Sequence, residues 1–120
     1  MEERKLVLMI NNQKLTATLS DNSSVDALVD KLKQGAITIK MNDYANMEKV
    51  GTLGFRLPRN DESIATGAGD LILYQGNSFV IYYDHNNWNL TKLGKIDNVS
   101  QSELKKILGN GSVTVVLSLE

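Results

Sequence analysis

The residues best suited to ligand contact or chemistry gather in one short segment. Tyr82, Tyr83, His85 and Trp88 all fall within seven residues, and His85 is the only histidine of the chain. Clustered aromatic rings can stack against a planar ligand or a proline ring. The alternative is that these rings pack at the rim of a core with their polar tips in water, and that His85 lies in a solvent-exposed loop. Tyr82, His85 and Trp88 are therefore candidate ligand-binding residues.

A second candidate is the Phe55-Arg56 pair. A guanidinium offers a rigid fork of donors, which can hold a carboxylate or support the nitrogen of a prolyl amide. The alternative is an exposed arginine in an irregular segment, where most charged side chains are found. We keep Phe55 and Arg56 as candidate ligand-binding residues, and Arg56 is the one candidate for a catalytic role.

Other patterns that could support chemistry are weak. Asp70 follows a glycine, which is typical of a turn in which aspartate bonds to neighbouring backbone. The glycines at 67 and 69 precede a predicted strand rather than a helix, so they do not form a phosphate-binding loop. The chain has no cysteine, which excludes a thiol nucleophile and a zinc–thiolate site. We expect no metal and no cofactor.

The elements that must position these residues are those of one small domain, residues 1–120. Alternation of apolar and polar residues and the turn signals between runs predict strands. The first two form a hairpin, because Asn11-Asn12 tolerates the positive φ angles of a tight turn. The predicted strands are Lys5–Ile10, Gln13–Leu19, Ala36–Met41, Gly69–Gln75, Ser78–Asp84, Leu90–Ile96 and Ser112–Leu119. The stretch 42–69 shows no regular pattern and is long for a loop, so it should carry short strands or a functional loop.

Two helices are predicted from apolar residues at helical spacing. The first covers Ser23–Lys33, where Ser23 and Asp26 resemble a capping arrangement. The second covers Gln101–Leu108, after a Ser100-to-Glu103 capping box. The predicted core consists of the helix stripes and the last strand: Val25, Leu28, Leu32, Leu104, Ile107, Leu108, Val113, Val115 and Leu117. Together these elements predict a mainly β fold, a closed barrel of about eight strands with a short helix capping each mouth.

The charge of the chain is nearly balanced, with 13 basic and 14 acidic residues. A nucleic-acid backbone requires a basic surface, so we expect no nucleic-acid partner. No apolar stretch approaches the roughly 18 residues of a membrane helix, and the amino terminus lacks a signal-peptide pattern. We therefore expect a cytoplasmic protein that does not enter a membrane, exported only if a leader has been removed.

Three segments carry a resemblance to a known family. They are residues 69–83, residues 93–108 with the sequence Leu93-Gly94-Lys95-Ile96-Asp97 before the helix, and residues 51–58. These segments resemble the small bacterial cyclophilin-like proteins, and the resemblance covers nearly the whole chain. It implies a minimal cyclophilin-like barrel of poorly defined activity, in a family sometimes fused to flavodoxin-type domains.

The segment after Leu93 also resembles the corresponding strand and helix of true cyclophilins, which are peptidyl-prolyl isomerases. Their active-site pattern is largely missing here. The position of their rim histidine is Leu90, Phe79 replaces their glutamine, and their floor phenylalanine falls on Ile81. Arg56 is only a partial stand-in for their catalytic arginine, because it is shifted by one position.

Three functions remain open after this comparison. The leading one is a binding module for a small molecule or an extended peptide, with little or no isomerase activity and a concave pocket lined by Phe55, Tyr82 and Trp88. The second is a peptidyl-prolyl isomerase, which requires Arg56 to point into a hydrophobic cleft. The third is a domain that docks onto a flavodoxin-type redox partner through a flat apolar patch.

Overall fold

The computed structural model describes residues 4–120, which form nine strands and two helices. In chain order these are β1 (Lys5–Ile10), β2 (Gln13–Leu19), α1 (Ser23–Lys33), β3 (Ile37–Tyr44), β4 (Glu48–Thr52), β5 (Glu62–Thr66), β6 (Asp70–Tyr74), β7 (Ser78–Tyr82), β8 (Asn86–Ile96), α2 (Gln101–Leu108) and β9 (Val113–Leu119). In this part of the chain no helix has both the length and the apolar character needed to cross a bilayer.

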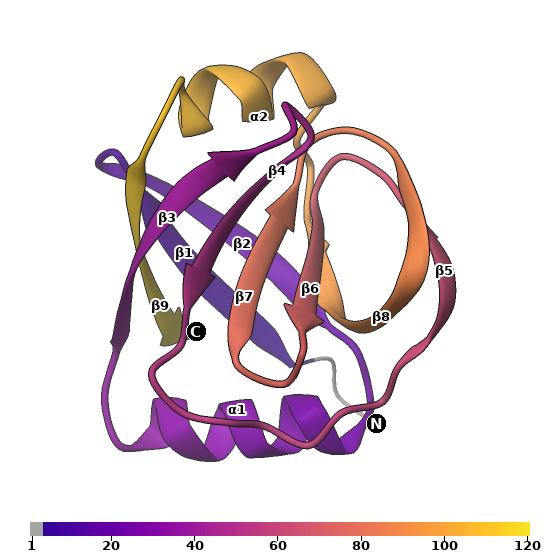
Figure 1. The fold of residues 1–120 in the computed structure, drawn as a ribbon. Helices are drawn as coiled ribbons and strands as arrows, with labels where there is room; N and C mark the ends of the chain where they lie inside the picture. The colour runs from indigo at the N-terminus through magenta and orange to yellow at the C-terminus, as the bar shows by residue number, and fades with distance from the viewer. Residues whose placement is uncertain (1–3) are drawn as a thin grey trace.

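Eight of these strands close into an antiparallel barrel (Figure 1). Neighbouring strands follow the order β2-β1-β9-β3-β4-β7-β6-β8, and the pairing of β2 with β8 joins the two ends. The remaining strand, β5, lies outside this ring and pairs with β8. The closed barrel predicted from the sequence is confirmed, and β5 is an addition that the sequence did not define.

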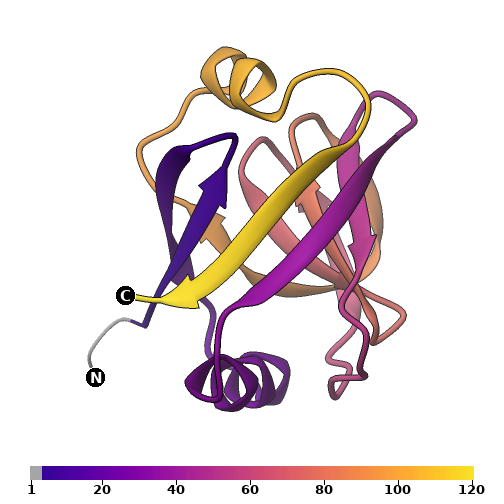
Figure 2. The ribbon, with the colours of Figure 1, turned by 90° about the vertical axis from the view of Figure 1, so that its left-hand side faces the viewer.

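The two helices lie at opposite ends of the barrel (Figures 1 and 2). In α1, Leu28 is completely buried under the barrel, as its apolar stripe predicts. The capping residue of α1 is Asn22, whose side chain accepts a hydrogen bond from the backbone N–H of Val25 at 2.9 Å. The prediction that Ser23 takes this role is wrong, because Ser23 is already the first helical residue. The capping box of Ser100 and Glu103 is confirmed in α2.

The inner face of the barrel and the two helices enclose one main apolar core. All but one of the predicted core residues are buried. The exception is Ile107, which is half-buried and packs against the edge of the core. The turn of the first hairpin adopts the predicted positive φ angles, 49° at Asn11 and 66° at Asn12.

Two predicted strands are longer than expected. The third strand runs on to Tyr44, and β8 begins at Asn86 instead of Leu90. Both extensions consist largely of polar residues, which carry no apolar alternation. Their strand conformation comes from pairing, with β4 beside the end of β3 and β5 beside the start of β8. The unpatterned stretch 42–69 thus holds β4 and β5.

Gly94 closes the barrel where β8 meets β2. It lies opposite Leu19, and a Cβ added to it would lie 3.1 Å from the Cα of Leu19 and closer still to the carbonyl oxygen of Thr18. We expect Gly94→Ala to lower the free energy of unfolding by about 1–3 kcal/mol, the usual effect of overpacking. Urea denaturation would measure it, with Gly67→Ala as the matched control, because no atom lies within 4 Å of a Cβ at Gly67. Equal midpoints for the two variants would contradict this account of the closure.

Candidate functional site

A two-stranded arm stands out from the barrel beside β6 (Figure 1). From Thr91 onwards β8 pairs with β6, whereas its first residues, Asn86–Leu90, pair with β5. We call β5 and Asn86–Leu90 the arm. Thr91, which is completely buried, marks its base: its hydroxyl donates to Asp61 at 2.7 Å and accepts from the backbone N–H of Asn60 at 2.8 Å. These bonds fix the point at which β8 leaves the barrel.

The arm covers a second apolar cluster on the outer face of the barrel. Because successive side chains of a strand point to opposite faces, alternate residues of β4, β6 and β7 project outward here. The buried members of this outer cluster are Ile72, Val80, Tyr82 and Leu90, and Met47, Val50 and Ile64 pack against them. The chain therefore buries apolar side chains on both faces of this part of the sheet.

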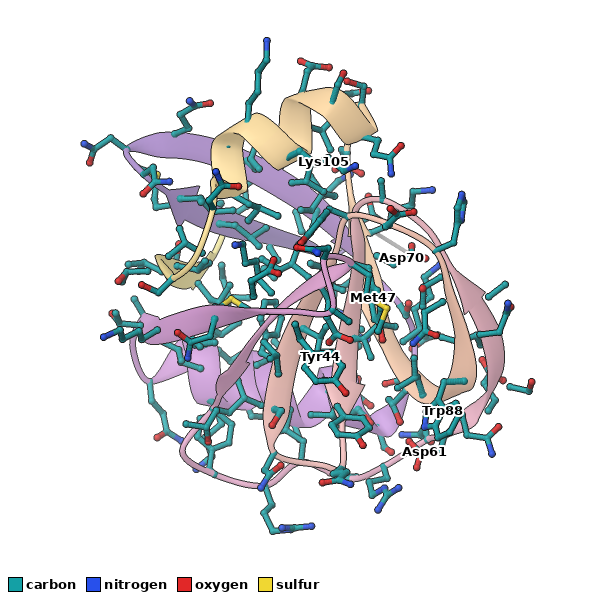
Figure 3. The ribbon with its side chains drawn as sticks, turned by 45° about the horizontal axis from the view of Figure 1, so that its top comes forward. Tyr44, Met47, Asp61, Asp70, Trp88 and Lys105 are labelled. Carbon is teal, nitrogen blue, oxygen red and sulfur yellow. The ribbon has the colours of Figure 1, made fainter. Side chains whose placement is uncertain are left out.

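A cavity of about 450 Å³ opens between the arm and the outer face of the barrel. We call it the arm pocket; it is lined by Tyr44, Met47, Glu48, Val50, Tyr74, Tyr82, Asn86, Trp88 and Leu90. Three of the lining rings are exposed, with 62% of Trp88, 59% of Tyr44 and 37% of Tyr74 open to solvent. Figure 3 shows Tyr44 and Met47 on the barrel side and Trp88 on the side of the arm.

A row of three paired residues crosses the arm pocket. Tyr44 of β3 lies opposite Glu48 of β4, and Glu48 lies opposite Tyr82 of β7. Directly paired residues of an antiparallel sheet bring their Cβ atoms to about 4.5–5.5 Å on the same face. The Glu48 carboxyl is thus held between two tyrosines, although only 7% of Glu48 is exposed.

The electrostatics of this row follow from burial. Burial raises the pKa of Glu48; a hydrogen bond from Tyr82 acts in the opposite direction, and the charge of Asp43 adds to the increase. Burial also raises the pKa of Tyr82, to about 12, against a hydrogen bond from the Asn86 amide at 3.1 Å. The pocket therefore contains one buried acid and a neutral phenol beside it. Sequence reasoning missed Glu48, because it lies in the unpatterned stretch and no local signal marks it.

The structure brings two of the predicted ligand-binding residues together. Tyr82 and Trp88 line the arm pocket from β7 and from the arm. His85 is exposed just before the arm, with its ring Nδ1 3.3 Å from the carbonyl oxygen of Thr66, and it does not line the pocket. Of the clustered side chains, Tyr82 and Trp88 thus share one cavity, Tyr83 lines the cavity beside α2, and His85 lines neither.

Phe55 and Arg56 lie elsewhere. Phe55 is half-buried beside α1, where the Lys31 ammonium lies 5.0 Å from the centre of its ring. Arg56 is exposed, and its guanidinium donates to the carbonyl oxygen of Gln75 at 3.2 Å. The expected pocket of Phe55, Tyr82 and Trp88 is thus wrong in its first member, because residues 53–58 run past α1 rather than along the outer face.

A second cavity, of about 320 Å³, lies at the mouth of the barrel beside α2. Here the completely buried Lys49 donates to the carbonyl oxygen of Gly111 at 2.6 Å and lies 3.3 Å from Asp43, which also accepts a hydrogen bond from the Tyr83 hydroxyl. The Lys105 ammonium lies 5.9 Å from the centre of the Tyr83 ring. These contacts tie the loop after α2 to the barrel, so they have a structural role.

No metal centre is visible in the described part of the chain: among residues 4–120, no three His, Cys, Asp or Glu side chains gather as a set of ligands. The aspartate at 70 takes part in a turn, as its sequence context predicts, since its Oδ2 accepts from the backbone N–H of Gly67 at 2.9 Å. Its other oxygen lies 3.6 Å from the Lys92 ammonium.

Comparison with known proteins agrees with the fold. Among solved structures, the chain is similar to the hypothetical protein AF2241 from Archaeoglobus fulgidus, with a TM-score of 0.69 and 17% identity over 98% of this chain and 95% of that one. No curated protein matches the sequence significantly. The sequence pattern of the cyclophilin-like family matches residues 8–118. This chain, with its closed barrel and two helices, belongs to the cyclophilin-like family.

Proposed function

We propose that this chain is a binding module whose ligand, a small molecule or an exposed group of an extended peptide, occupies the arm pocket. The observation that carries the proposal is the grouping of three exposed aromatic rings around one cavity with a buried carboxyl in its wall. The volume of the cavity falls within the range of about 300–1,000 Å³ common for ligand pockets.

The composition of the pocket supports this function. Ligand sites are mostly apolar and aromatic, with a few polar groups that orient the ligand. Here Met47, Val50 and Leu90 supply apolar surface, and Glu48 and Asn86 supply the polar groups. Large aromatic rings gain free energy when they are covered, so exposed rings that face one cavity favour a ligand between them.

The docking alternative predicts a different surface. A flat apolar patch would suit a redox partner, whereas three exposed rings of this chain line a concave cavity whose wall includes a buried acid. The shape and the polarity of the arm pocket therefore favour a ligand that enters it.

Fluorescence offers a direct test, because Trp88 is the only tryptophan and lies in the pocket. We expect small planar compounds to change the Trp88 emission and to shift the amide NMR signals of β4 and the arm. Tyr74→Ala should weaken the best binder roughly fivefold, the loss of about 1 kcal/mol of aromatic contact. Met9→Ala is the matched control, since Met9 is similarly exposed (38% against 37%) and does not line the pocket. NMR shifts confined to other surfaces would refute the proposal.

The isomerase alternative gives a separate prediction. The enzyme must stabilise the twisted prolyl amide more than the planar one, and each tenfold in rate requires about 1.4 kcal/mol. Arg56 is exposed and bonded to the backbone of Gln75 rather than directed into a hydrophobic cleft. We expect no measurable acceleration of prolyl isomerisation in an exchange-NMR assay on a short peptide, and no change on Arg56→Ala. A rate that this substitution abolishes would make the chain an isomerase.

A further inference from the structure

The arm pocket collects most of the chain's hydroxylated and indole rings. Three of the four tyrosines and the single tryptophan line it, and they come from four different strands: Tyr44 from β3, Tyr74 from β6, Tyr82 from β7 and Trp88 from β8. Tyr44, Tyr74 and Tyr82 belong to neighbouring strands of the barrel, and Trp88 belongs to the arm on the other side of the cavity. A ligand in the pocket therefore lies between aromatic side chains of the barrel and of the arm.

Aromatic faces carry negative electrostatic potential, and they attract a cation that lies within about 6 Å of the ring centre. Tryptophan attracts a cation most strongly, and tyrosine follows. Several such rings around one site form a cage, which is the arrangement that recognises quaternary ammonium groups. The ring set of the arm pocket has this composition.

The buried acid adds the second half of the argument. Glu48 lines the pocket with 93% of its surface covered, and the residues that line the pocket include no lysine, arginine or histidine. Its neighbour Lys49 lies on the opposite face of β4 and pairs with Asp43. A buried carboxylate without a basic partner is unfavourable, and a bound cation would remove that penalty.

We infer that the arm pocket binds an alkylated ammonium group, with Tyr44, Tyr74, Tyr82 and Trp88 as the cage and the Glu48 carboxylate as the counter-ion. This inference rests on the proposed function, because it names the ligand class of the same pocket. An alkylated ammonium suits the pocket better than a primary one, since a bare ammonium is compact and strongly hydrated and loses more on entering an apolar site.

The groups that face Glu48 set the pH dependence of this binding. On the same face of the sheet they are Tyr44 on β3, Tyr82 on β7 and, next to Tyr82, Tyr74 on β6, and the charge of Asp43 acts on Glu48 from the opposite face of β3. The pKa of Asp43 is lowered and that of Tyr82 is raised to about 12, so neither changes its charge where the raised pKa of Glu48 lies. A cation binds the ionised form of Glu48. Its affinity should therefore fall as the pH falls through the pKa of Glu48, while the affinity of a neutral ligand should not.

The test compares choline with its neutral isostere, 3,3-dimethyl-1-butanol, by Trp88 fluorescence and amide NMR shifts on the full chain. We expect choline to bind at least about tenfold more tightly, since the cation gains both ring and carboxylate contacts. Glu48→Gln should lose about tenfold for choline and leave the isostere unchanged. Tyr74→Ala should weaken the binding of choline without altering the row of Tyr44, Glu48 and Tyr82. Met9→Ala should change the binding of neither choline nor its isostere. Far-UV circular dichroism confirms that each variant is folded.

Two further probes identify the source of the group. A short peptide that carries trimethyl-lysine, compared with its unmodified form, tests whether the ammonium group belongs to a peptide side chain. Free choline tests whether it belongs to a small metabolite-like amine. Equal affinity of choline and its isostere would overturn the inference and leave the proposed function intact. Binding of planar compounds without any binding of choline or the methylated peptide would do the same. If no probe of either kind binds the pocket, both the inference and the proposed function fail.

Discussion

Leu28→Ala is expected to lower the free energy of unfolding by about 2–5 kcal/mol, the range for a large core side chain truncated to alanine. Leu28 is completely buried in the stripe by which α1 closes its end of the barrel. The substitution removes its apolar contacts and leaves a cavity, because the strands around it cannot collapse inward. Urea denaturation followed by circular dichroism measures the loss.

Ile107→Ala is the comparison within the second helix. Ile107 is only half-buried, so we expect a smaller loss, about 1 kcal/mol, near the centre of the distribution for point substitutions. If both substitutions cost less than about 0.5 kcal/mol, as surface changes do, neither helix would contribute its stripe to the core.

Asp43→Asn is the second substitution with a large expected effect. Lys49 is completely buried and Asp43 is the carboxylate beside it, at 3.3 Å. Removing the charge of Asp43 leaves the ammonium without its counter-ion, which for buried pairs costs about 3–5 kcal/mol. A quarter of the Asp43 side chain is exposed, so water replaces part of the lost interaction and we expect about 3 kcal/mol, the lower limit.

Lys49→Met gives the matched variant of that pair. This substitution replaces the buried ammonium with an apolar side chain of similar length. The partly exposed Asp43 keeps its hydrogen bond from Tyr83. We therefore expect Lys49→Met to cost clearly less than Asp43→Asn in urea denaturation, because an apolar residue replaces a buried ion at little cost. The reverse order would show that the ion pair itself provides the stability.

The Asp43–Lys49 pair also predicts that the folded chain loses stability at acidic pH. Burial alone would raise the pKa of Asp43, but the hydrogen bonds from Tyr83 and Lys49 outweigh it and hold the pKa below its ordinary value of 3.8. A lowered pKa means that the stabilisation is complete above the unfolded value and is lost as the pH falls through the folded one. As the pH is lowered from 5 to below 3.8, the free energy of unfolding should therefore fall less for the Asp43→Asn variant than for the native chain. Urea denaturation of both proteins at each pH measures this difference.

Two of the nine residues that line the arm pocket could be predicted from the sequence. Tyr82 and Trp88 were identified because two aromatic residues close together in a chain indicate a shared surface, and the arm pocket contains both. Phe55 and Arg56 were candidates because a guanidinium beside an aromatic ring suits ligand contact, but the path of residues 53–58 beside α1 separates them from the pocket. No local pattern distinguishes Glu48 from an ordinary surface acid.

The elements whose signals are local follow from the amino-acid sequence alone. The hairpin turn at Asn11-Asn12, the capping box of α2 and the alternation in β9 depend on neighbours within a few residues. Such patterns reflect the periods of 3.6 and 2 that the backbone imposes. They were sufficient to predict a closed barrel with two helices and the part of its core that the helix stripes and β9 supply.

The positions of the arm and its pocket depend on contacts between strands that are distant in the sequence. The polar start of β8 becomes a strand because β5 pairs with it, and Glu48 becomes a buried acid because β3 and β7 place Tyr44 and Tyr82 on either side of it. Residues 44 and 82 are far apart in the chain, and the register of strands distant in sequence is set by the closure of the whole barrel. A one-residue shift of β4 would turn Glu48 inward and Lys49 outward.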